Sequence, residues 1–244
     1  MPPLLGAWDF LKSAKLQFGA ELPPNIQALR PAIVEAAGLI GGESARQILE
    51  QAINDSDPQV VQKAAGALGA QRDPQGVEAL IELLSKCGDV GQSAFEALGA
   101  MDDRRGNKAL KGFLKSEDPL LRIQAAYALS MSEGSSYRGA LVDALVDGKI
   151  ERGNKILAAY YLAKLGDLGG VDYLSLSASK GGPHEKVLAI QALGKCAHPK
   201  AAQPLLKALA TPDAQTRLLV TRALGQLGGK EAIALAVSMI ANGD

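Results

Sequence analysis

The chain has 244 residues, of which 47% are hydrophobic and 21% are charged, so it can bury a substantial core and is not disordered. Lys and Arg together number 26, as do Asp and Glu, so the formal net charge is zero. No basic excess is available to neutralise a phosphate backbone, which argues against nucleic acid as the main partner.

Targeting and membrane-spanning segments are not predicted. No Lys or Arg precedes the apolar residues of the first 20 positions, and Asp9 lies among them, which is not the layout of a secretory signal. The longest late apolar stretch without a charge, residues 232–241, is about half of the roughly 20 residues that a membrane-spanning helix needs. Cys87 and Cys196 form no disulfide framework. We therefore expect a soluble, cytoplasmic protein without membrane insertion.

The amino-terminal residues 1–42 are predicted to form an atypical helical cap. Apolar residues fall close to one helical stripe at Trp8, Leu11 and Phe18, but the segment does not keep the repeat that follows. Repeat arrays need atypical terminal units, which favours a cap that closes the core. The alternative is a hook for a partner or a membrane surface, centred on Trp8 and Phe10.

From residue 43 to residue 244 the sequence predicts a single array of helical repeats. The phrase Ala-Leu-Gly and weaker copies of it define six anchor leucines about 31 residues apart: Leu68, Leu98, Leu129, Leu162, Leu193 and Leu224. A small residue precedes each anchor by four positions, one helical turn back on the same face, and apolar residues 12 and 16 positions later define another helix. A unit of two helices cannot bury its apolar faces alone, so the units must stack into a solenoid.

Local signals place the helix ends. Cap-like residues before proline are expected to open helices at Asp57-Pro58, Asp118-Pro119, Gly182-Pro183 and Thr211-Pro212. Glycines that directly follow the anchors are expected to close the helices in the left-handed conformation: Gly69, Gly99, Gly194 and Gly225.

The last segment, residues 231–242, is expected to supply only the first helix of a unit. Its apolar residues spread around much of the helix circumference, at Ile233, Leu235, Val237, Met239 and Ile240. Solenoid ends normally carry polar caps. The chain therefore either associates end to end through this helix, stacks on a partner there, or belongs to a longer parent.

The repeat resembles a known family. The sequence motif of that family appears here as Asp118-Pro119, Arg122, Ala125-Ala126 and Ala128-Leu129. A second copy of the motif begins at Asp57. From about residue 43 to the carboxyl terminus the chain resembles the HEAT-repeat family, specifically the short bacterial type called phycobilisome-lyase HEAT-like repeats. This resemblance implies an all-α, right-handed α-solenoid of stacked antiparallel helix pairs, with about six repeats of about 31 residues, and a binding scaffold.

A partner-binding surface is predicted on the helix that carries the anchor. Positions two, five and nine before each anchor lie opposite the buried stripe, and the resemblance implies that this helix lines the concave surface. From the third anchor onward these positions become apolar or aromatic, as in interfaces that hold an extended or helical segment. The predicted partner-binding residues are Leu120, Tyr127, Leu157, Tyr160, Leu188, Gln191, Leu219 and Arg222. The alternative is that curvature packs these helices together and hides their side chains.

Charged residues also recur in register. Cations stand seven positions before four of the anchors, at Arg122, Lys155, Lys186 and Arg217. Polar residues also recur five positions after four of the six anchors, at Asp73, Asp103, Asp167 and His198. Seven residues are nearly two helical turns, so the cations point toward the seam between repeats. Structural ion pairs across repeats are expected there, rather than a phosphate site.

No catalytic residue, metal site or cofactor is predicted. His184-Glu185 is similar to one pair of deoxyhypusine hydroxylase, but that di-iron chemistry needs several such pairs and the chain has two histidines. Neither cysteine has a matched histidine. The leading hypothesis is a non-catalytic scaffold or adaptor that binds another protein or peptide segment on its concave surface. The alternative is a chromophore lyase subunit resembling the phycobilin lyases, which would need a bilin pocket.

Overall fold

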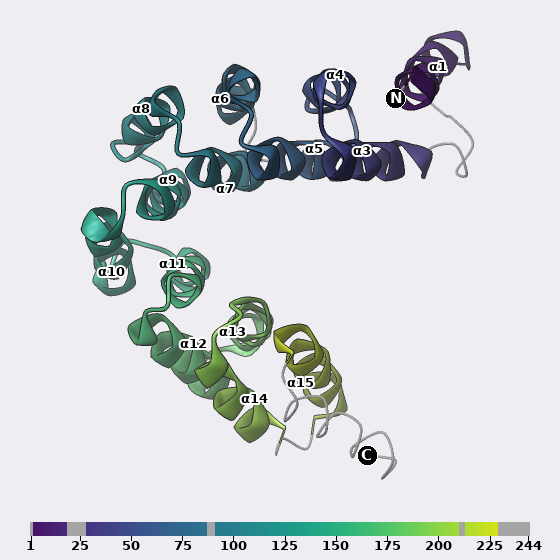
Figure 1. The fold of residues 1–244 in the computed structure, drawn as a ribbon. Coiled ribbons are helices and arrows are strands. Elements are labelled where there is room, and N and C mark those ends of the chain that lie inside the picture. Colours follow the sequence, from purple (N-terminus) through teal and green to yellow (C-terminus); the bar gives the residue numbers. More distant parts are fainter. Residues whose placement is uncertain (1, 19–27, 87–90, 210–212, 229–244) are drawn as a thin grey trace. The chain divides into compact units, whose positions relative to one another are not determined.

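In the computed structural model, residues 2–18, 28–86, 91–209 and 213–228 are described, and all their regular structure is helical (Figure 1). The all-α prediction is therefore confirmed. The α helices are α1 (Pro2–Phe18), α3 (Leu29–Ile40), α4 (Glu43–Ala52), α5 (Pro58–Gln71), α6 (Val77–Lys86), α7 (Gly91–Met101), α8 (Arg104–Phe113), α9 (Pro119–Ser132), α10 (Arg138–Val146), α11 (Arg152–Lys164), α12 (Leu168–Lys180), α13 (Pro183–Lys195), α14 (Ala202–Ala208) and α15 (Ala214–Leu227). Within the described ranges, none of them combines the length and apolar character needed to cross a bilayer.

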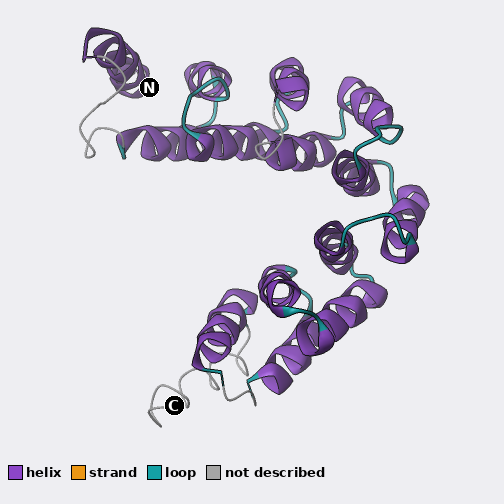
Figure 2. Cartoon of the chain, turned by 180° about the vertical axis from the view of Figure 1, so that it is seen from behind, coloured by secondary structure: helices purple, strands orange, loops and turns teal. Residues whose placement is uncertain are grey.

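The helices form two compact units, each with an anchor row and an opposite row (Figure 2). Unit 1 comprises Met1–Ser116 and Ala128–Gly134, and its anchor row is α3, α5 and α7. Unit 2 comprises Glu117–Tyr127 and Ser135–Asp244, and its anchor row is α11, α13 and α15, with α10, α12 and α14 opposite. Stacked helix pairs are thus confirmed within each unit. The division into a cap (1–42) and one continuous array (43–244) stays a prediction.

The helix starts follow the predicted capping residues. The carboxylates of Asp57 and Asp118 each accept a hydrogen bond from the backbone N–H two residues on, at 2.9 Å. Gly182 directly precedes α13. Thr211 lies outside the described residues, and α15 is capped by Asp213, which accepts from two backbone N–H groups.

The polar residues five positions after the anchors prove to be helix caps, a role that the sequence prediction did not assign to them. Asp73, Asp103 and Asp167 each accept from the backbone N–H two residues on, and Nδ1 of His198 does the same at 3.2 Å. Asp73 additionally pairs with Arg46 at 3.3 Å. Helix initiation therefore accounts for their recurrence, because each lies just before the opposite-row helix of its repeat.

The glycines after the anchors lie inside helices, so the prediction that they end them is wrong. A Cβ atom at Gly69 would lie 2.6 Å from Cα of Ala97, and one at Gly194 would lie 2.7 Å from Cα of Ala223. Gly99 packs on the next anchor-row helix at equally short range. Glycine is needed here because successive anchor-row helices approach backbone to backbone. We call this contact the Gly-on-Ala joint.

Helix α3 makes the same joint ahead of the predicted start of the array. A Cβ atom at Gly38 would lie 2.8 Å from Cβ of Ala67 on α5, and Ala37 is fully buried. Ala37-Gly38 therefore takes the place of an anchor leucine and its glycine. This copy is not recognisable from the sequence pattern, because alanine replaces the leucine that defines the anchors.

Helix ends instead coincide with a left-handed residue four positions after the anchor. The φ angles there are 50° at Arg72, 52° at Asp102, 82° at Gly166 and 53° at Ala197. Only glycine adopts this conformation without a steric cost. In these four repeats the chain therefore reverses at the same position, whichever residue occupies it, whereas after Leu129 the left-handed residue is Gly134, five positions on.

This position offers a reciprocal test on exposed residues. Ala197→Gly is expected to raise the free energy of unfolding by up to about 1 kcal/mol. Glycine removes the steric cost of the left-handed conformation in the folded state, and this gain is larger than the loss caused by the greater conformational entropy of glycine in the unfolded chain. Gly166→Ala, at the same position of the preceding repeat, is expected to lower it by about 1–2 kcal/mol. Urea unfolding of both variants checks this prediction, and effects of equal sign would contradict it.

Helix α1 packs on α3 and α4 through Trp8. The Trp8 side chain is 2% exposed, and its Nε1 donates a hydrogen bond to Oε1 of Gln51 at 3.1 Å. Phe10, on the same helix, is 66% exposed. The hook hypothesis is wrong for Trp8, whose burial is that expected of a cap.

Candidate functional site

The predicted binding positions lie on one face of the anchor row of unit 2. Leu157, Leu188 and Leu219 are half-buried at the same register of α11, α13 and α15. Three residues further on, Tyr160 is half-buried, whereas Gln191 and Arg222 are exposed. We call these six residues the ladder face. Because the Gly194 joint keeps α13 and α15 in register, equivalent positions point to the same side.

Helix α9 does not extend this face, which corrects part of the prediction. Tyr127 is only 3% exposed, and its ring stacks on Tyr161 of α11 with centroids 4.0 Å apart and an interplanar angle of 3°. Gln124 is buried as well, and Leu120 is half-buried. The expected exposure of Tyr127 is therefore wrong, because neighbouring helices pack tightly enough here to cover it.

The aromatic cluster fixes a cation at one end of the ladder face. Nζ of Lys164 lies 5.0 Å from the ring centroid of Tyr127 and 5.5 Å from that of Tyr160. Cation–π contacts of this length stabilise an ammonium group without neutralising its charge. The ammonium group of Lys164 therefore lies beside Tyr160, at one end of the ladder face.

Cations are concentrated on the anchor row of unit 2. Helices α11, α13 and α15 carry three, two and two Lys or Arg residues, seven together, and a single acid, Glu185. The opposite row, α10, α12 and α14, carries three cations and two acids, and α3, α5 and α7 carry two of each. A chain of zero net charge thus presents a locally basic face.

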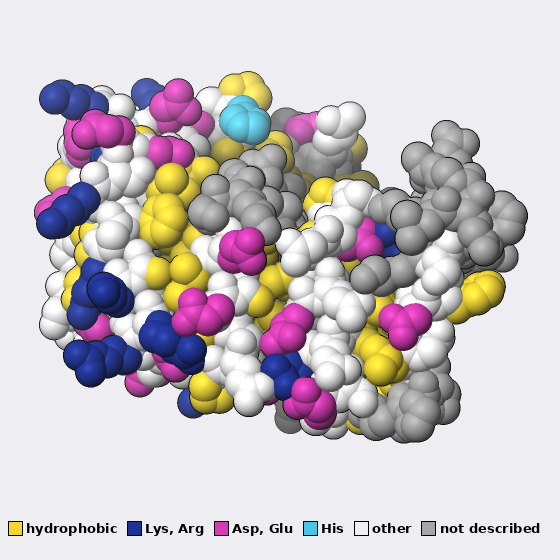
Figure 3. Space-filling view, turned by 90° about the horizontal axis from the view of Figure 1, so that it is seen from above, with side chains coloured by type: hydrophobic (Ala, Val, Ile, Leu, Met, Phe, Trp, Pro, Cys, Tyr) yellow, Lys and Arg dark blue, Asp and Glu magenta, His cyan; other side chains and the backbone are white. Residues whose placement is uncertain are grey.

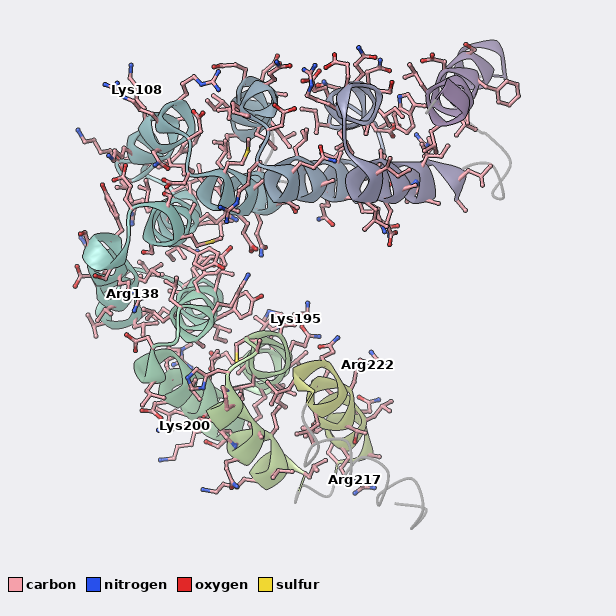
Figure 4. The ribbon with its side chains drawn as sticks, viewed as in Figure 1. Lys108, Arg138, Lys195, Lys200, Arg217 and Arg222 are labelled. Atoms are coloured by element: carbon pink, nitrogen blue, oxygen red, sulfur yellow. The ribbon has the colours of Figure 1, made fainter. Side chains whose placement is uncertain are left out.

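The one acid in this row is already paired. Nη1 of Arg152 lies 2.9 Å from Oε1 of Glu185, and this hydrogen bond lowers the pKa of the Glu185 carboxyl below its usual value. Lys195 and Arg222, both exposed, form no ion pair with any carboxylate in the described ranges; Figure 4 shows them on α13 and α15. The basic character of the face is therefore not cancelled from within the anchor row.

A groove of about 1430 Å³ adjoins the ladder face and is formed by α12, α13, α14 and α15. It contains the exposed apolar side chains Leu168, Leu176 and Val187. Its charged lining consists of Lys186, Lys200, Lys207, Asp172 and Asp213. Leu219 and Gln215 line both the groove and the anchor-row surface. Sequence reasoning missed the groove because its residues come from four helices and share no spacing.

A second basic surface lies on α8 of unit 1, at the side where dark blue side chains gather in Figure 3. Arg104 and Lys108 are exposed there. Arg105 pairs with Glu78 at 3.1 Å, and Lys111 pairs with Glu133 at 2.7 Å. This helix is a solvated face with internal ion pairs, so it is a weaker candidate site than the ladder face.

The remaining reactive side chains show no catalytic arrangement in the described ranges. Cys196 is 3% exposed, burial raises the pKa of its thiol, and Sγ lies 3.2 Å from the backbone oxygen of Leu193. A protonated, buried thiol is a core residue rather than a nucleophile. No three His, Cys, Asp or Glu side chains of the described residues gather as metal ligands would. Cys87 lies outside the described residues. So does the segment 231–242, for which end-to-end association is predicted from the sequence.

Comparison with known proteins supports a repeat fold. A family model of HEAT repeats matches residues 24–95 and 174–244. The chain is similar to the solved complex of CpcE and CpcF of phycocyanin lyase from Nostoc sp. PCC7120, with a TM-score of 0.53 and 18% identity over 92% of this chain and 96% of that chain. It also matches human deoxyhypusine hydroxylase in complex with glycerol, with a TM-score of 0.40 and 18% identity over 92% and 96% of the two chains. No curated protein matches. At these identities the likeness to the lyase concerns the fold alone.

Proposed function

Because this chain belongs to the HEAT-repeat family, we propose that it is a non-catalytic scaffold or adaptor that binds a segment of a partner protein on the ladder face. The observation that supports this function is the alignment of half-buried Leu157, Leu188 and Leu219 on three successive helices. Apolar side chains repeated in register beside exposed polar ones suit an extended or helical segment.

The ladder face makes the scaffold hypothesis testable by crosslinking. A photo-crosslinking amino acid at Gln191, which is exposed on α13, is expected to capture the partner in cells that produce this protein. The same group at Gln59, which is exposed on α5 of unit 1, is the matched control and is expected to capture it poorly.

A retention assay then tests the same surface without the crosslinker. A Tyr160→Ser/Gln191→Ala variant is expected to lose the captured partner, whereas a Gln59→Ala/Lys63→Ala variant is expected to retain it. Tyr127 and Tyr161 are left unchanged because they belong to the core. Circular dichroism and thermal unfolding verify that each variant is folded. Equal retention by the two variants would overturn the proposed location.

The groove supports a second candidate, a chromophore lyase subunit. Apolar walls with Lys186, Lys200 and Lys207 could hold a flat apolar ligand that carries carboxylates, as a bilin does. A bilin titration is expected to shift the visible absorbance of the ligand if this candidate holds, and Lys200→Glu/Lys207→Glu should abolish the shift. An unchanged spectrum in the presence of the wild-type protein would remove this candidate.

A further inference from the structure

We propose that the ladder face selects an acidic segment, in which Asp or Glu recurs about every third residue of an extended chain with apolar residues between. This inference deepens the proposed function and rests on it. It identifies the chemistry of the partner from the charge and spacing of the anchor row in unit 2.

The positive charge of the ladder face determines the charge expected of the partner. Lys195 and Arg222 come from the successive helices α13 and α15 (Figure 4), and Lys164 occupies on α11 the position that Lys195 occupies on α13. Positions two before and two after an anchor lie on the same side of the helix as the ladder leucines. Lys195 and Arg222 form no ion pair with a carboxylate among the described residues, and the ammonium group of Lys164 lies over the rings of Tyr127 and Tyr160. Opposite charges across an interface steer association and reject partners of the wrong sign. An acidic segment therefore complements this face.

The spacing of the helices sets the period of the partner. Packed helices lie about 8–10 Å apart, and the joint of Gly194 on Ala223 favours the lower part of that range. A segment in the extended polyproline II conformation advances about 3.1 Å per residue with three residues per turn, so it passes one helix about every three residues and turns the same side to each. Acidic side chains with that period would meet one cation on each successive helix.

The leucines distinguish a peptide from a nucleic acid. Leu157, Leu188 and Leu219 are half-buried at equivalent positions, next to the cations rather than apart from them. Single-stranded nucleic acids are held by cationic grooves with aromatic stacking platforms, whereas aliphatic side chains favour the apolar residues of a peptide. The partner segment is thus expected to be amphipathic as well as acidic.

Three fluorescent peptides test the proposal by anisotropy with the full chain. The first repeats Glu-Leu-Thr five times, the second has the same composition in scrambled order, and the third replaces Glu by Lys. The first is expected to bind about tenfold more tightly than the scrambled peptide and to weaken with added salt. The Lys peptide is expected not to bind.

Charge reversal supplies the matched variants. Lys195→Glu/Arg222→Glu is expected to weaken binding of the Glu peptide about tenfold or more. Arg104→Glu/Lys108→Glu changes the net charge equally on α8 and is expected to leave the affinity within about twofold. Equal binding of the Glu and scrambled peptides, equal effects of the two variants, or tighter binding of a single-stranded oligonucleotide would each overturn the inference.

The outcome is separable from that of the proposed function. If crosslinking at Gln191 captures a partner whose retention is insensitive to Lys195→Glu/Arg222→Glu, the scaffold stands and the acidic segment does not. If crosslinking at Gln191 fails while the Glu peptide binds with the expected selectivity, the surface binds acidic chains but the scaffold function loses its support.

Discussion

Replacing Gly69 by alanine is expected to lower the free energy of unfolding by about 1–3 kcal/mol, the usual cost of forcing extra volume into a packed core. The new Cβ atom would lie 2.6 Å from Cα and 2.7 Å from Cβ of Ala97. The nearest of these atoms belongs to the backbone, so no side-chain rotation can relieve the clash and the two helices must separate. Gly69→Ala should therefore weaken the contact between α5 and α7 along its length.

The matched control stands three residues earlier on the same helix. A Cβ atom at Gly66 would have no neighbour within 4 Å, so Gly66→Ala is expected to raise the free energy of unfolding by about 0.5–1 kcal/mol through helix propensity. Guanidinium unfolding followed by circular dichroism measures both changes. If Gly69→Ala were as stabilising as Gly66→Ala, the Gly-on-Ala joint could not be a close backbone contact.

Replacing Trp8 by alanine is expected to detach α1 from unit 1. Removing a buried tryptophan costs about 3–5 kcal/mol in a core, and this change also deletes the hydrogen bond to Gln51. A terminal helix of a repeat array can unfold by itself. The decrease in the free energy of unfolding therefore cannot exceed the free energy with which α1 packs on the rest of unit 1. Hydrogen exchange is therefore expected to accelerate first in α1 and then in α4, with a fall in the melting temperature.

Phe10 provides the comparison for Trp8. Its ring is 66% exposed, so Phe10→Ala is expected to change the free energy of unfolding by no more than about 0.5 kcal/mol and to leave hydrogen exchange in α4 unaltered. Unchanged exchange after Trp8→Ala would mean that α1 contributes nothing to closing the end of unit 1.

The core could be predicted from the sequence because it depends on local periodicity. All six anchor leucines are buried, with Leu162 at 1% and the other five at 0% exposure. A recurring apolar residue with a small residue one turn earlier has one interpretation in a helix, namely the buried face. The capping aspartates before proline were predictable for the same reason, since the cap and the N–H groups that it accepts from are neighbours in sequence.

Other features could not be predicted because they depend on which helix lies opposite. A glycine after an anchor suits either a left-handed helix end or a close helix contact, and only the position of Ala97 on the next helix decides for Gly69. Tyr127 has the spacing of an exposed residue, yet Tyr161 covers it. The same limit applies to the groove, whose lining exists only after four helices have assembled.

The Gly-on-Ala joint has a consequence for how arrays of this kind can grow. The joint uses a glycine on one helix and an alanine near the anchor of the next, as in Gly38 with Ala67, Gly69 with Ala97 and Gly194 with Ala223. Each helix between two such joints therefore presents the same two contact surfaces to its neighbours. Duplication or deletion of a whole repeat by recombination would restore an equivalent joint on both sides, so array length can change without new complementary surfaces having to arise.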